Sequence, residues 1–151
     1  MNTLYRLARR SPFAPAGLLM MAFLPLLSLP AAAEPLFNQI NLVTDDQSVD
    51  TAQITDPTLK NAWGISFGPT SPFWVSANGT GVSNLYRVDP TTNTPTKLGL
   101  TVSIPGDGSV TGQVFNSNNS GPNPAFNGDL FIFVSEDGTI SGWRGVLGIT
   151  A

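Results

Sequence analysis

Carboxylates are the side chains in this sequence that are best suited to chemistry, and most of them lie in short polar segments. The candidates occur in TDDQSVD, PGDGS and SEDGT: they are Asp45, Asp46, Asp50, Asp107, Glu136 and Asp137. Carboxylate and carbonyl oxygens are the ligands that Ca²⁺ takes, so these residues are the candidates for a metal site. The alternative is that they are solvated acidic loops and tight Asp-Gly turns. We expect the second, and hence no cofactor, with calcium as the alternative.

The sequence contains neither His nor Cys. The usual Ser-His-Asp relay, His-ligated zinc and haem, and thiolate nucleophiles or ligands are therefore excluded. These absences weigh against most enzymes, and no catalytic residue is assigned. The enzyme that remains possible is a calcium-dependent or lactonase-like hydrolase that gathers Asp, Glu and Asn from several repeats.

Aromatic side chains are the second group of candidates, because they line ligand clefts as well as cores. They fall mostly on expected strands, where aromatic residues more often pack between sheets, so we expect a core role. The residues concerned are Trp63, Phe73, Trp74, Tyr86, Phe131, Phe133 and Trp143.

Two echoing segments indicate the elements that would position these residues. FWVSANGTG at 73–81 is followed by IFVSEDGTI at 132–140. Each has an apolar run typical of a strand and a Gly-containing turn. We expect Asn78-Gly79 to form a positive-φ pair, with Asp137-Gly138 in its place in the second copy.

The flanking segments extend the echo into two repeated units. NAWGISF at 61–67 alternates Trp63, Ile65 and Phe67, which predicts a strand with one buried face. Further strands are expected at 82–89 and 96–104. TGQVF at 111–115, LFIFVSE at 130–136 and ISGWRG at 140–145 follow in the same order, after a lead-in strand within 37–45.

Short antiparallel strands repeated at about 40–50 residues are typical of propeller blades. The sequence therefore predicts an all-β partial β-propeller of about two four-stranded antiparallel blades, the first at 61–105 and the second at 110–151. A β-sandwich or another all-β fold is the alternative. Propellers typically have 4–8 blades, so we expect a chain that is part of a longer product or that assembles with its copies. Residues 34–151 alone should be poorly stable or self-associating.

Two long segments carry a resemblance to a known family. Residues 41–90, from NLVTDDQ to YRVDP, and residues 128–145, GDLFIFVSEDGTISGWRG, resemble an uncharacterised family of secreted bacterial proteins, some with a PEP-CTERM sorting signal. The resemblance implies a propeller-like extracellular protein with NHL-style repeats. Members are longer than this chain, and the family supplies no activity or catalytic residue.

The N-terminal segment has the order of a secretory signal. Arg6, Arg9 and Arg10 precede a mostly apolar stretch that is broken by prolines, and AAAE offers small residues for cleavage after Ala33. We expect a signal peptide at 1–33 and a mature domain at 34–151, against an uncleaved anchor or a buried helix as the alternative. The mature form should have no membrane span.

Without residues 1–33 the chain keeps four basic and all ten acidic residues, a formal charge of −6. Such a surface disfavours nucleic acid as a partner. The first expectation is an exported binding or surface-interaction module, secreted or held in the periplasm or at the cell surface, with an unknown ligand, protein or cell-surface partner. The alternatives are the hydrolase above and a structural envelope or matrix protein.

Overall fold

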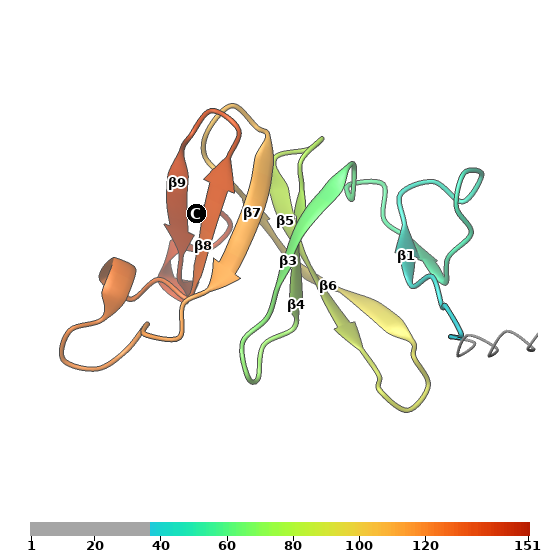
Figure 1. The fold of residues 1–151 in the computed structure, drawn as a ribbon, viewed down its shortest axis with the longest axis horizontal. Helices are drawn as coiled ribbons and strands as arrows, with labels where there is room; N and C mark the ends of the chain where they lie inside the picture. Colours follow the sequence, from blue (N-terminus) through green and yellow to red (C-terminus); the bar gives the residue numbers. More distant parts are fainter. Residues whose placement is uncertain (1–36) are drawn as a thin grey trace, which may run out of the picture. The chain divides into compact units, whose positions relative to one another are not determined.

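The computed structural model describes residues 37–151, and the predicted signal peptide at 1–33 lies outside the described residues. These residues form β-sheets joined by turns and two 3-10 turns, with no α-helix among residues 37–151 (Figure 1). The strands are β1 Val43–Thr44, β2 Ile54–Thr55, β3 Ala62–Ser66, β4 Phe73–Ala77, β5 Val82–Val88, β6 Pro95–Ser103, β7 Val110–Phe115, β8 Phe131–Ser135 and β9 Ile140–Trp143. The predicted all-β class is confirmed. In this part of the chain no helix has the length and hydropathy of a membrane span.

Two antiparallel sheets dominate the described residues. The first has the order β3-β4-β5-β6 and the second the order β7-β8-β9. The strands of the second sheet are the three expected from the segments at 111–115, 130–136 and 140–145, and residues 37–151 add no fourth strand to it. The lead-in strand is reduced to β1, which pairs with β2 in parallel (Val43 with Ile54). Sequence reasoning missed β2, because two residues show no periodicity.

The turn between β4 and β5 corrects the prediction for Asn78-Gly79. Neither residue has a positive φ; the left-handed position is Gly81, with φ 66°. Ala77 pairs with Val82 across this turn. In the shorter β8–β9 turn, where the Ser135 nitrogen donates to the Thr139 oxygen, Gly138 has φ 85°. Gly81 is therefore the counterpart of Gly138, since both supply the conformation that glycine adopts without steric cost.

β3 and β7, the first strands of the two sheets, each contain a β-bulge at the corresponding place. The pairing of β3 with β4 shifts between Ala62 and Ile65, and the pairing of β7 with β8 shifts between Val110 and Gln113. Each bulge contains a glycine, Gly64 in β3. A Cβ on Gly64 would lie 2.6 Å from the Thr111 oxygen, so the absent side chain lets the backbones of β3 and β7 approach closely.

The core lies between the two sheets and is centred on Trp74. Its ring stacks on Phe131 at a centroid distance of 4.2 Å and contacts Trp143 at 4.8 Å. Gln113 also joins the sheets, because its Nε2 donates to the backbone oxygens of Gly64 (3.0 Å) and Trp74. The buried apolar cluster comprises Trp74, Leu85, Val102, Ile104, Val110, Phe131, Phe133 and Trp143.

The strand pairing gives a residue-by-residue correspondence between the sheets. Phe73 pairs with Tyr86 as Phe131 pairs with Trp143. Phe131 and Trp143 lie on the side of β7–β9 that packs against β3–β6. Phe73 and Tyr86 lie on the far side of β3–β6, since Trp74, next to Phe73, points toward β7–β9 and side chains alternate along a strand. Corresponding sides of the two sheets therefore point the same way, and the sheets stack in one sense.

This stacking leaves two sides without a second sheet among residues 37–151. The front face is the side of β3–β6 that carries Ile65, Phe73, Val75 and Tyr86. The back face is the side of β7–β9 that carries Val114, Val134 and Ile140.

The prediction that Trp63, Ile65 and Phe67 have a buried side is wrong for the described residues, where they are 58%, 64% and 61% exposed. The alternation is present, but no helix or strand of residues 37–151 covers this end of the front face. The prediction of a core role is confirmed for Trp74, Tyr86, Phe131, Phe133 and Trp143, whereas Phe73 is half-buried.

Candidate functional site

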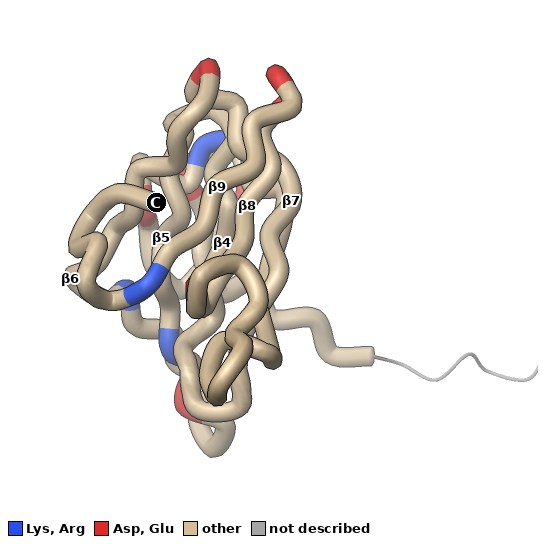
Figure 2. The backbone as a smooth tube through the Cα atoms, turned by 90° about the vertical axis from the view of Figure 1, so that its left-hand side faces the viewer, with Lys and Arg blue, Asp and Glu red and all other residues tan. Residues whose placement is uncertain are grey.

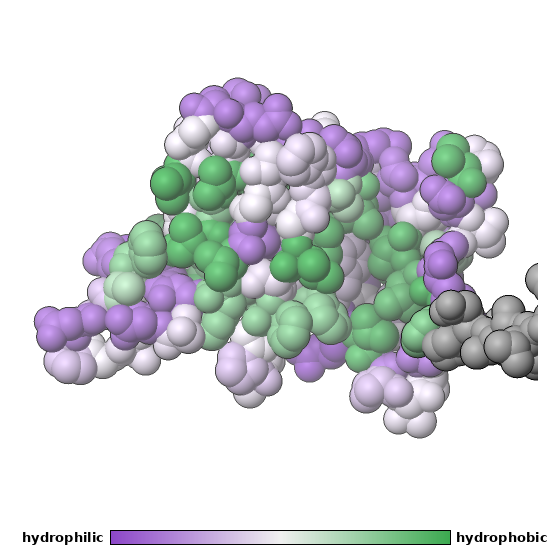
Figure 3. Space-filling view, in the orientation of Figure 1, coloured by the Kyte–Doolittle hydropathy of each residue, from purple (hydrophilic) through white to green (hydrophobic). Residues whose placement is uncertain are grey.

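A groove of about 780 Å³ lies between the front face and the segment that contains β1 and β2. Its floor is apolar and is formed by Ile65, Phe73, Val75, Tyr86 and Val88. Figure 3 shows apolar residues gathered across the exposed surface, with hydrophilic residues around them. An apolar floor with a few polar groups is the usual composition of a binding site. The polar lining groups are Gln39, Asn41, Thr44, Asp45, Asp50 and Asn61.

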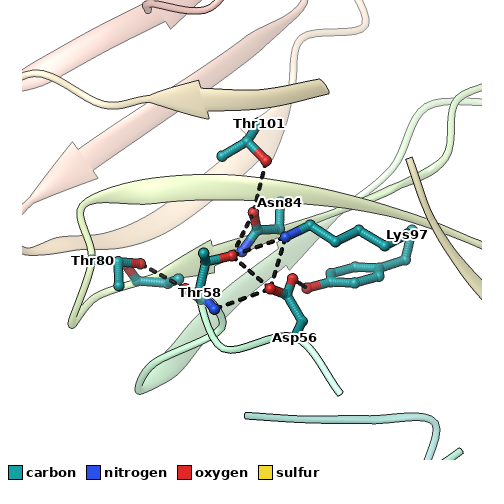
Figure 4. Close-up of polar contacts among 8 residues, drawn as sticks. Asp56, Thr58, Thr80, Asn84, Lys97 and Thr101 are labelled. Carbon is teal, nitrogen blue, oxygen red and sulfur yellow. Dashed lines mark hydrogen bonds and ion pairs between the residues drawn. The ribbon is translucent and has the colours of Figure 1, made fainter. Parts of the chain in front are cut away.

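Asp56 fixes one wall of this groove. Its carboxylate is 1% exposed and accepts hydrogen bonds from the Lys97 Nζ (2.7 Å), the Thr58 Oγ1 (2.6 Å) and the Thr58 backbone nitrogen (3.0 Å), as Figure 4 shows. The Tyr86 hydroxyl donates to the second carboxylate oxygen. The chain before β3 is thereby tied to β5 and β6.

The charges of this cluster follow from its surroundings. Burial alone would raise the pKa of Asp56, but hydrogen bonds from Lys97, Thr58 and Tyr86 outweigh it and hold the pKa below its ordinary value. The pKa of Tyr86 is raised, first by burial and then by the hydrogen bond to Asp56 and its charge. Asp56 is thus an ionised acceptor and Tyr86 a protonated donor, an arrangement that ties the segment before β3 to the sheet.

Asn84 extends the cluster across the sheet. Its Oδ1 accepts from the Thr101 Oγ1 at 3.1 Å and lies 3.3 Å from the Thr58 Oγ1, whose proton is donated to Asp56 (Figure 4). The Thr58 carbonyl accepts from the Thr80 Oγ1 at 2.7 Å, which joins the same segment to the β4–β5 turn. The wall of the groove is therefore held from two strands, β5 and β6, and from the β4–β5 turn.

The structure separates the N-terminal carboxylates. Asp45 forms an exposed ion pair with Lys60 at 2.8 Å and lines the groove together with Asp50. Asp46 instead accepts hydrogen bonds from the side chain and backbone of Ser48, which lower its pKa. This is the geometry of a turn that an Asp side chain closes on its own backbone.

The remaining carboxylate candidates also serve turns, and Figure 2 shows acidic positions at the tips of two turns. Asp107 accepts from the side chain and backbone of Ser109, which lower its pKa. Asp137 accepts from the Thr139 nitrogen at 2.9 Å. Glu136 accepts from the Asn78 Nδ2 at 2.9 Å. Among residues 37–151 no three acidic side chains converge in the manner of a metal site.

Sequence reasoning missed the groove and the Asp56 clamp, by which we mean the hydrogen bonds that Asp56 accepts from Lys97, Thr58 and Tyr86. Asp56-Pro57-Thr58 is a turn signal, and it contains the one acidic side chain that is fully buried among the described residues. The ion pair between Asp56 and Lys97 joins residues that are 41 positions apart, so no local pattern predicts it.

No family model, curated protein or solved structure matches this chain. The resemblance to secreted, propeller-like bacterial proteins therefore stays a prediction.

Proposed function

We propose that this chain is an exported β-propeller-like module that binds a partner through its front face. The observation that carries the proposal is that the two sheets stack in the same sense, with corresponding sides pointing the same way. Same-sense stacking can be continued at both ends by further sheets, as in a propeller, whereas a two-layer sandwich closes once its inner sides meet.

The composition of the front face supports a binding role. Ile65 is 64% exposed at the floor of a groove whose outer wall is fixed by the Asp56 clamp. Exposed apolar area of this kind on a sheet is typical of an interaction surface. Export is supported by the sequence alone, through the basic, apolar and small-residue order of residues 1–33.

Export and binding have separate tests. Expressed from the full sequence in a bacterial host, the protein should leave the cytoplasm and begin at Glu34, as N-terminal sequencing will determine. Exported material that begins at Met1 would contradict the export half.

For binding, the fraction of exported protein retained on the cell envelope is measured for the wild type and for Ile65→Gln. Retention should fall in Ile65→Gln, because an amide on the apolar floor disfavours contact. The matched control is Phe126→Gln, which changes a residue of similar exposure (62%) in the η1 turn Ala125–Gly128. Equal retention of all three proteins, together with a wild type that does not self-associate in sedimentation velocity, would contradict the binding half.

A further inference from the structure

We propose that the partner on the front face is a second copy of this chain, whose back face covers the exposed end of the front face around Ile65 in a head-to-tail contact. This inference rests on the proposed function and names the partner of the same surface. The contact between the two sheets within one chain has a counterpart on the two free faces, where apolar residues replace the polar residues of the internal contact on both sides.

The internal contact is centred on Gln113. Its Nε2 donates to the Gly64 oxygen at 3.0 Å, and its Oε1 accepts from the Ser83 Oγ at 3.0 Å. Ser76 on β4 is buried like Ser83, and the strand order places it between Gly64 on β3 and Ser83 on β5. A polar side chain on β7 thus lies in a site on β3–β5 that is formed by one glycine and two serines.

The strand pairing identifies the corresponding residues on the free faces. In the position of Gln113, the front face presents Ile65. In the positions of Gly64, Ser76 and Ser83, the β7–β9 sheet presents Gly112, Val134 and Ile140.

The internal contact thus places a polar side chain, Gln113, beside serines. At the corresponding positions the free faces have an apolar side chain, Ile65, and a site of valine and isoleucine. Ile65, Val134 and Ile140 are 64%, 39% and 67% exposed. An isoleucine that enters a site formed by valine and isoleucine gains the burial that all three lack in one chain. A partner of unrelated chemistry gives no reason for these two changes to occur together.

Gly112 supplies an independent geometric sign. A Cβ on Gly64 would collide with the backbone of β7, whereas a Cβ on Gly112 would meet nothing within 4 Å. The bulge and the glycine are thus repeated in β7, but no strand among residues 37–151 occupies the close approach that they permit. In the proposed contact β3 of the second copy, near Trp63, takes this place.

The contact is heterologous, because the front face of one copy meets the back face of the next, so a chain of copies grows until it closes. Each copy brings two sheets, and propellers close with 4–8 blades, so a closed assembly would hold about two to four copies. The Asp129–Arg144 ion pair (2.5 Å) lies against Gly142 on the back face and limits the apolar contact to the end near Gly112.

The test measures the mass of the exported, purified protein by sedimentation velocity over a range of micromolar concentrations. The wild type should form a discrete assembly of about two to four copies. Gly112→Val should be monomeric, since its side chain fills the free approach. Gly99→Val is the matched control: Gly99 lies in β6 and also has open space around it, so this variant should assemble like the wild type.

Two further measurements make the test specific. Ile65→Gln should raise the dissociation constant about tenfold or more. A mixture of Gly112→Val and Ile65→Gln should give dimers, since the first keeps an intact front face and the second an intact back face.

A wild type that stays monomeric throughout, or a Gly112→Val protein that assembles as well as Gly99→Val, would overturn the proposal. If the monomeric wild type is still retained on the envelope through Ile65, the front face binds a different partner. The proposed function then stands while this inference fails.

Discussion

The two corresponding aromatic rows of this protein differ in what packs on them. In the β7–β9 sheet, Phe131 and Trp143 are 2% and 8% exposed, because Trp74 of the other sheet lies on them. In the β3–β6 sheet, the corresponding Phe73 is half-buried, Tyr86 is 4% exposed through the contacts of its hydroxyl with Asp56, and both line a groove. The difference shows that the same strand pattern becomes a core or a binding surface according to what packs on it. Local sequence therefore determines the row, and tertiary context determines its role.

The largest expected loss of stability comes from truncating a side chain of the buried aromatic row in the β7–β9 sheet. Phe131→Ala should lower the free energy of unfolding by about 3–5 kcal/mol, because it leaves a cavity beneath Trp74. Phe73→Ala should cost about 1–2 kcal/mol, since Phe73 is only partly buried. Urea unfolding measures both, in the Gly112→Val background so that assembly does not contribute. Equal losses would show that the two rows are equally packed.

The next effect concerns the two glycines of the bulges. Gly64→Ala should destabilise the protein by about 1–3 kcal/mol, because its methyl group collides with the backbone of β7. Gly112→Ala should leave stability unchanged or raise it by about 0.5–1 kcal/mol, since glycine weakens a strand and the space is open. Thermal unfolding compares the two in the Ile65→Gln background, at a protein concentration where sedimentation shows a monomer, so that assembly does not contribute. A loss at Gly112 as large as that at Gly64 would then refute the open approach.

The next prediction concerns the pH dependence of stability. The Asp56 clamp ties the segment before β3 to the β3–β6 sheet, and the β7–β9 sheet takes no part in it. The folded-state pKa of Asp56 is lowered, so its contribution is present above about pH 4 and is lost as pH falls through the folded pKa. Asp56→Asn should cost about 1–3 kcal/mol at pH 7, less than for a fully buried pair because the Lys97 side chain is 32% exposed.

The measurement is urea unfolding of the wild type and Asp56→Asn at pH 7 and at pH 3. The difference between the two proteins should shrink at the lower pH, where the carboxylate of the wild type begins to protonate. A difference that stays constant would mean that the charge of Asp56 does not support the fold.

The smallest expected effect is that of calcium. A ligand that binds only the folded protein raises its melting temperature, and the acidic turns use their carboxylates for their own backbone and side chains. We therefore expect no shift on adding calcium chloride relative to magnesium chloride at equal ionic strength. A saturable rise with calcium alone would revive Asp45, Asp50 and their neighbours as ligands and favour the hydrolase.

The strands were predictable, but their register was not. The aromatic and β-branched runs at β4 and β8 located the strands correctly, because period-two patterns report local structure. The echo aligned Gly79 with Gly138, whereas the positive φ belongs to Gly81, since the first turn is one residue longer. A shift of one residue moves every side chain to the other side of a sheet, so the sequence alone could not say which sides correspond.

The candidate site was less predictable than the strands. Asp56 and Lys97 meet only after the four strands β3–β6 have paired, and the groove depends on where a segment with two short strands is tied down. The exposure of Ile65 follows from what covers the front face, which no local pattern encodes.

The most direct test of head-to-tail stacking between copies is a cross-link from the front face of one copy to the back face of the next. The Ser83–Gln113 contact within the chain corresponds to a contact between Ile140 of one copy and Ile65 of the next. The chain has no cysteine, so Ile65→Cys and Ile140→Cys introduce the only thiols. With a short bismaleimide, the double variant should form covalent ladders or closed oligomers, and an equimolar mixture of the single variants should form dimers that neither forms alone. Dimers of the Ile65→Cys variant by itself, or no cross-link in the mixture, would contradict head-to-tail stacking.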